Sequence, residues 1–71
     1  MEFKVGERLP NDAFVDRYAI TDIGITVLAF TGIDDATPWV TWCLDKRKNA
    51  YWGHYFSDRD KANEDFRKRA I

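Results

Sequence analysis

The sequence predicts an α+β fold, in which an antiparallel meander of three to four strands carries one C-terminal helix packed on one face. Three observations lead to this fold class. Two segments, 37–44 and 50–56, are rich in Trp, Tyr, Val and Thr, which favour strands, and a polar stretch separates them. A charged segment after Ser57 has the pattern of a helix. Residues 25–31 form a further apolar strand candidate, which ends at Gly32.

The C-terminal helix has clear start and stop signals. Ser57 is the expected N-cap, and Asp60 follows three residues later as a weaker form of the capping box. Acidic residues gather in the first turns and basic residues in the last, an order that complements the helix dipole. The apolar stripe is thin, because it consists of Ala62, Phe66 and Ala70. The helix therefore needs a larger surface to lie on, with Phe66 as its anchor.

The remaining segments are assigned from turn chemistry and alternation. Residues 45–49 are polar and form the turn of a hairpin, with Asp suited to its start and Asn to its end. For residues 13–20 we expect a strand, although Phe14 and Tyr18 at i,i+4 spacing would also suit a short helix. Phe3 and Val5 either add a short N-terminal strand or pack as a tail.

The pairing register of the hairpin has two alternatives, and a one-residue slip exchanges the faces of its side chains. A three-residue loop puts Trp42 opposite Trp52, whereas a four-residue loop puts Trp42 over Gly53. We prefer the first register, which gathers a core on one face: Val40, Trp42, Leu44, Trp52 and Phe56. Trp39, Tyr51 and Tyr55 would then flank Gly53 on the other face, which the helix does not cover.

Length and composition limit the class of protein. The 71 residues fit a single domain, 1–71, close to the lower limit for a self-sufficient hydrophobic core. One Cys and one His cannot form an internal disulfide or a four-ligand zinc site, so we expect no metal and no cofactor. Residues 1–4 lack the apolar run of a signal peptide, and no stretch approaches the ~20 apolar residues that span a bilayer. A cytoplasmic location without membrane contact is the expectation.

Catalytic chemistry has one candidate pair, Cys43 and His54. A Cys–His dyad requires both side chains within hydrogen-bond reach in an accessible pocket. The preferred register places them on opposite faces, and the alternative register makes them neighbours on one face. Because a strand Cys is usually a small buried apolar residue, we expect a protein that is not an enzyme.

Binding is the function class that the aromatic residues favour. The chain has three Trp, three Tyr and five Phe residues, and six of these eleven lie between residues 39 and 56. A single sheet face cannot take all six, so we expect a protein-binding surface with Trp39, Tyr51 and Tyr55 as anchors. Basic residues of the turn would form its rim: Lys46, Arg47 and Lys48. Burial of this face by the N-terminal segment or in a homodimer is the alternative.

Charge leaves a second binding hypothesis open. Residues 1–36 carry seven acids and three bases, whereas residues 37–71 carry five acids and eight bases. This asymmetry can orient a partner or a second copy of the chain. The basic turn and the basic helix end, residues 67–69, would suit nucleic acid. The slightly negative net charge of −1 makes a nucleic-acid partner the less favoured alternative.

The Trp/Tyr pattern of residues 39–42 and 51–56, followed by a charged helix with Phe66, resembles small uncharacterised proteins of phages and conjugative elements of Gram-positive bacteria. The resemblance covers residues 37–66 and contains no catalytic motif. Small proteins of such mobile elements include inhibitors of host defence, among them anti-CRISPR proteins, and DNA-maintenance accessories. The resemblance therefore implies a non-enzymatic inhibitor that docks on a host nucleoprotein, or a small nucleic-acid-binding accessory protein.

Overall fold

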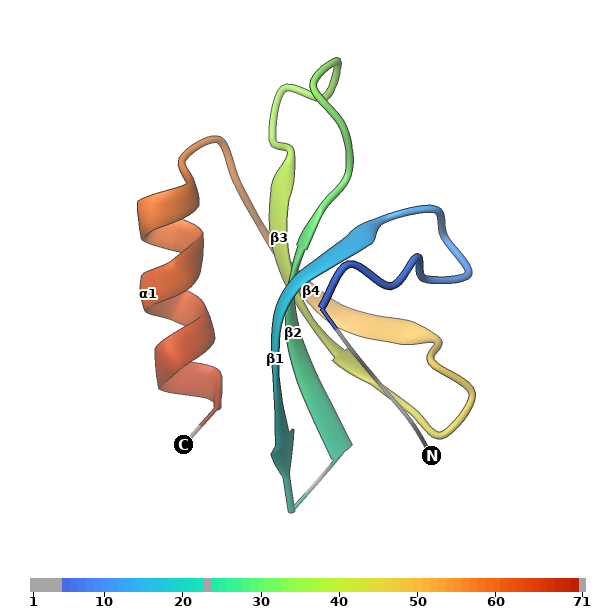
Figure 1. Cartoon of the computed structure of the whole chain (residues 1–71). Helices are drawn as coiled ribbons and strands as arrows, with labels where there is room; N and C mark the ends of the chain where they lie inside the picture. Colours follow the sequence, from blue (N-terminus) through green and yellow to red (C-terminus); the bar gives the residue numbers. More distant parts are fainter. Residues whose placement is uncertain (1–4, 23, 71) are drawn as a thin grey trace.

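The computed structural model describes residues 5–22 and 24–70 and confirms the α+β fold. Four strands form one antiparallel sheet in the order β1-β2-β3-β4, and a helix follows the last strand (Figure 1). The elements are β1 (Phe14–Thr21), β2 (Gly24–Phe30), β3 (Trp39–Leu44), β4 (Ala50–Phe56) and α1 (Arg59–Arg69). The sheet is thus a meander, in which each strand pairs with the next one along the chain.

The ends of the elements refine two of the sequence predictions. The segment at 13–20 is a strand, as expected, because β1 pairs with β2 along its whole length. Helix α1 begins one residue later than predicted: Asp58, not Ser57, is the N-cap, and its side chain accepts a hydrogen bond from the backbone N–H of Asp60. Val5 is exposed and lies in a turn, and Phe3 lies outside the described residues.

Helix α1 covers one face of the sheet and buries its thin apolar stripe there. Phe66 is 4% exposed and packs with Leu28 of β2 and with Ala62. Half-buried side chains of the sheet and the helix surround this cluster: Ala19, Trp39, Phe56 and Ala70. Phe66 is therefore the anchor that the sequence predicted. Its complete burial stabilises the fold by about 1.5–3 kcal/mol.

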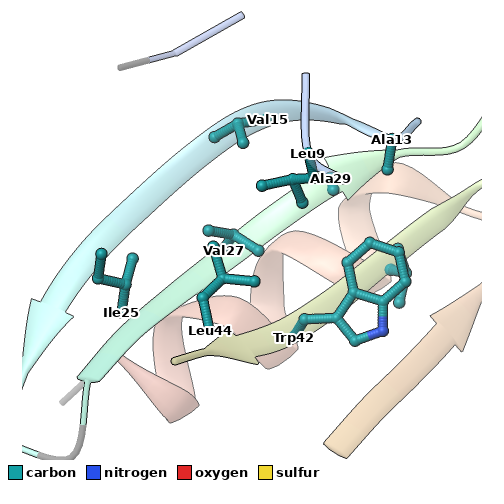
Figure 2. Close-up of a cluster of buried hydrophobic side chains, with 9 residues drawn as sticks. Leu9, Ala13, Val15, Ile25, Val27, Ala29, Trp42 and Leu44 are labelled. Carbon is teal, nitrogen blue, oxygen red and sulfur yellow. The ribbon is translucent and has the colours of Figure 1, made fainter. Parts of the chain in front are cut away.

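The chain's own N-terminal segment, residues 6–13, covers the central part of the opposite face. Its backbone pairs with the start of β1: Gly6 N donates to Val15 O over 2.7 Å, and Val15 N donates to Glu7 O over 2.9 Å. Leu9 and Ala13 reach down from this segment into the larger core cluster (Figure 2). The other buried members come from the sheet: Val15, Ile25, Val27, Ala29, Val40, Trp42 and Leu44. The sheet thus has a core on both faces.

The turn between β3 and β4 holds the hairpin and the N-terminal segment together. Asp45 N donates to Asn49 O, and Lys48 N donates to Asp45 O. Lys48 takes the left-handed conformation with φ 64°, and its Nζ forms an ion pair with Glu7 of the N-terminal segment. The backbone N–H of Asn49 donates to the Asp45 carboxylate and lowers the pKa of that group below its ordinary value. The turn is therefore fixed by its own polar groups.

Candidate binding surface on the last strand

A β-bulge in β4 combines the two registers that the sequence left open. Near the turn, Cys43 pairs with Tyr51 and Leu44 with Ala50, which is the register of the three-residue loop. Beyond the bulge, Thr41 pairs with His54, Val40 with Tyr55 and Trp39 with Phe56, which is the register of the four-residue loop. Two residues, Trp52 and Gly53, thus oppose Trp42 where a regular strand has one.

The bulge redistributes the aromatic side chains between the two faces. Trp39 and Phe56 belong to the cluster under the helix, and Tyr51 pairs with Cys43 on that same side. Tyr55 lies on the opposite side, where its ring meets Trp42 edge-on at 6.2 Å between centroids. The prediction that Trp39, Tyr51 and Tyr55 share one uncovered face is therefore wrong. The reason is that a bulge changes the alternation at a single point within the strand.

Trp52 and Tyr55 are the aromatic residues of β4 that remain open to solvent. Their exposed fractions are 68% and 56%, whereas Trp42 on β3 is 7% exposed. The prediction that Trp52 joins Trp42 in the core is therefore wrong as well. Trp52 has φ 54°, a backbone conformation that bulky residues rarely adopt. Sequence reasoning missed the exposure of Trp52, although Gly53 beside it was the available signal for a bulge.

Trp39 has a structural position rather than an exposed one. Its ring packs against Phe30 with 4.8 Å between centroids, and the Arg59 guanidinium lies 5.6 Å from its centre. Arg59 also pairs with Asp16 of β1 over 2.7 Å. Trp39 is therefore part of the packing that joins the start of α1 to the sheet.

The basic turn divides into two exposed cations and one that is engaged. Lys46 and Arg47 are exposed, and neither forms an ion pair within residues 5–22 and 24–70. Lys48 is half-buried and paired with Glu7. An open pocket of about 290 Å³ lies beside the turn and is lined by Pro10, Asn11, Lys48, Asn49 and Ala50. Lys46 and Arg47 thus remain open to solvent in the turn before β4, whereas Lys48 holds the N-terminal segment.

A polar cluster connects α1 to the two last strands. Thr41 Oγ1 donates to Asp65 Oδ2 over 2.6 Å, and His54 Nδ1 lies 3.0 Å from the same oxygen. Arg69 donates to Thr41 Oγ1 over 2.9 Å and to Cys43 Sγ over 3.3 Å. Partial burial raises the pKa of Asp65, but the hydrogen bonds from Thr41 and His54 outweigh it and hold this pKa below the ordinary value of an Asp carboxyl group.

This cluster also shows where the candidate dyad lies. Cys43 and His54 both face the helix, because β4 beyond the bulge follows the second register. The prediction that they lie on opposite faces is therefore wrong. Cys43 is 4% exposed and contacts Arg69, whereas His54 contacts Asp65. The two side chains thus have separate partners, and the arrangement supports the attachment of α1.

Among the residues that the structure describes, no three His, Cys, Asp or Glu side chains come together as metal ligands would. Over the same residues, no helix has the length and apolar character to span a membrane. Comparison of the chain with protein families, with curated proteins and with solved structures finds no match. A functional proposal therefore has to start from the exposed side chains of β4 and of the turn before it.

Proposed function

We propose that this chain is a non-enzymatic protein-binding module that contacts its partner through the last strand and the turn before it. We call this region the β4 surface, and it consists of Trp52, Tyr55, Lys46 and Arg47. The observation that carries the proposal is the exposure of Trp52 and Tyr55, at 68% and 56%, on a strand at the edge of the sheet. Trp, Tyr and Arg are the residues that are enriched in binding hot spots.

The backbone at Trp52 adds a second argument. A bulky residue with φ 54° costs free energy of about 1–3 kcal/mol, which the free protein must offset elsewhere. An apolar residue at a bulge would pack best if it pointed inward, yet this indole points to solvent. Burial of Trp52 against a partner would offset the free-energy cost of its strained backbone and would remove its exposed indole from water. Truncation of a hot-spot Trp or Tyr commonly costs about 2–4 kcal/mol of binding free energy.

Because of the resemblance to mobile-element proteins, we propose more specifically that the chain is an anti-CRISPR-like inhibitor of a host defence nucleoprotein. Charge is compatible with this partner, since the exposed Lys46 and Arg47 would meet an acidic neighbour beside the aromatic anchors. A plaque assay on a host with an active CRISPR system tests this form directly. Expression of the chain should raise plating efficiency, and an unchanged efficiency against each defence system tested would refute the inhibitor role.

Affinity capture tests the β4 surface independently of that role. The chain is immobilised, proteins from a Gram-positive bacterial lysate are captured, and the partner is identified by mass spectrometry. Its affinity is then measured by calorimetry for the wild type, Trp52→Ala and Tyr55→Ala. Each variant should weaken binding by at least about thirtyfold while retaining the circular dichroism spectrum of the fold.

The matched control is Ile33→Ala, because Ile33 is 88% exposed and lies in the loop between β2 and β3. This control should bind the partner as the wild type does. Equal binding by Trp52→Ala, Tyr55→Ala and the wild type would refute the β4 surface.

Nucleic-acid binding is the second candidate, favoured by one observation. The contact of Arg69 with Cys43 places the basic end of α1 near the basic turn that follows β3, so that two basic clusters lie at one end of the molecule. A gel-shift series with single- and double-stranded DNA at low salt tests this candidate. Binding that falls steeply with salt would support it, and no shift at low salt would remove it.

A further inference from the structure

The N-terminal segment, residues 6–13, is attached to the rest of the chain by a small set of contacts. Within it Leu9 and Ala13 are buried, Glu7 is half-buried, and the other side chains are exposed. The backbone of Val15 both donates to this segment and accepts from it. A segment with few buried apolar contacts can open at a lower free energy than the whole fold.

The sheet and the helix have contacts of their own that do not depend on this segment. Among the described residues, the pairing of β1 to β4 runs from Phe14 to Phe56 and involves none of residues 6–13. The cluster under α1, formed by Leu28, Ala62 and Phe66, contains none of them either. Opening of the N-terminal segment therefore uncovers one face of the sheet and leaves the core on the other face in place.

One ion pair joins the N-terminal segment to the turn before β4. Its members, Glu7 and Lys48, are 41 residues apart in the chain, and both are half-buried. Beside this pair, residues 10–11 of the segment and residues 49–50 line the open pocket of about 290 Å³. The tip of the segment is thus not packed against the turn, and the ion pair forms the connection between them.

We propose that the N-terminal segment opens as a unit while the four strands and α1 stay folded, and that the ion pair of Glu7 with Lys48 is its latch. Opening removes Leu9 from the cluster that contains Trp42, and the ring of Trp42 also meets Tyr55 of the β4 surface. The segment thus regulates access to the apolar residues that adjoin this surface. The inference goes beyond the proposed function, because it concerns the chain without a partner.

Native-state hydrogen exchange on the full chain tests the opening. The amide of Val15 donates to Glu7 O and reports on the segment, whereas the amide of Leu28, in the central strand β2, reports on global unfolding. Val15 should be protected at least about tenfold less than Leu28. Phe66→Leu should lower the protection of Leu28 at least about threefold and leave that of Val15 unchanged. Equal protection of the two amides, or an equal fall in this variant, would overturn the opening.

A double-mutant cycle on the same Val15 amide tests the latch. Glu7→Gln should lower its protection about twofold to fivefold, and Lys48→Gln should cost less in that background than in the wild type. The matched control is Glu64→Gln, which removes the same charge and breaks an exposed ion pair with Lys68 on α1. This control should leave the protection of Val15 unchanged. Additive effects of Glu7→Gln and Lys48→Gln would overturn the latch.

Thiol labelling tests whether opening uncovers the sheet. Ala29 is fully buried with Leu9 and Ala13 in the cluster under the segment (Figure 2), whereas the natural Cys43 is buried on the helix side. In Ala29→Cys, the new thiol should react with iodoacetamide at least about tenfold faster than Cys43, each relative to its rate in urea. Equal relative rates would overturn the opening. Because the chain is tested without a partner, a failed capture of a partner would refute the proposed function alone.

Discussion

Substitution of Gly53 by Ala tests the bulge on which the β4 surface depends. A Cβ added at Gly53 would lie 2.6 Å from Trp42 Nε1, 2.9 Å from Trp42 Cδ1 and 3.0 Å from Tyr55 Cε1. The first two distances are shorter than real Cβ contacts, so the indole must move. Trp42 is 7% exposed and packed in the larger core cluster, which leaves it little room. A glycine is therefore required at position 53, because the buried ring of Trp42 approaches its backbone closely.

The expected cost follows from two opposing effects. Forcing an extra methyl group against a well-packed core costs about 1–3 kcal/mol. Replacement of Gly by Ala also restricts the unfolded chain, which returns about 0.4–1 kcal/mol. We expect a net loss of about 1–2 kcal/mol in the free energy of unfolding. A chain of 71 residues is stable by roughly 4–10 kcal/mol, so this loss is a measurable fraction.

Urea unfolding followed by Trp fluorescence measures this loss, and a double-mutant cycle locates its cause. Trp42→Phe removes Nε1, the indole atom that lies closest to the new methyl group. In that background Gly53→Ala should cost less by at least about 0.5 kcal/mol, as expected for residues in contact. A Gly53→Ala variant as stable as the wild type would refute the close approach. An equal cost in both backgrounds would show that Trp42 is not the obstacle.

Three further predictions concern the helix side of the sheet. Phe66→Ala should lower the free energy of unfolding by about 3–5 kcal/mol in urea, and a loss below about 1 kcal/mol would contradict its anchoring role. The folded-state pKa of Asp65 lies below the ordinary value of an Asp carboxyl group. This carboxylate therefore contributes stability at pH values above its unfolded pKa, and the contribution is lost as pH falls through the folded pKa. Asp65→Asn should therefore flatten the decline of stability as the pH falls below about 5, and an unchanged slope would exclude this carboxylate. Cys43 should react slowly with iodoacetamide in the folded protein and rapidly in urea, whereas rapid native labelling near pH 6 would revive the dyad hypothesis.

The helix and the hairpin turn were predictable because their signals are local. The order of charges along α1, the single Phe on its apolar stripe and the polar turn at 45–49 all act within a few residues of the chain. Even there the N-cap fell on Asp58 rather than Ser57, since both are good capping residues and only backbone geometry selects one. The strand at 13–20 was predicted from the alternation of its residues, and the pairing of β1 with β2 confirms this strand.

The candidate site was less predictable, because it depends on a single irregularity. Each register was a reasonable prediction for the whole hairpin, and the structure uses one on each side of the bulge. The position of the bulge decides that Trp52 is exposed, that Trp39 packs under α1 and that Tyr55 lies on the side of Trp42. Within the strands, Gly53 signals an irregularity but does not specify which register holds on each side of it. It follows from the packing of Trp42 over Gly53.

The sequence by itself determined the α+β class, the hairpin, the polarity of the helix and an excess of aromatic residues for one face. Only the tertiary structure decided what covers the second face and which aromatic residues remain exposed. The physical reason is that covering residues come from distant parts of the chain: Leu9 and Ala13 meet Trp42 and Leu44 in one cluster. Local propensity depends on neighbouring residues in the chain and does not encode such contacts. Burial of apolar surface across the sheet brings these distant residues together.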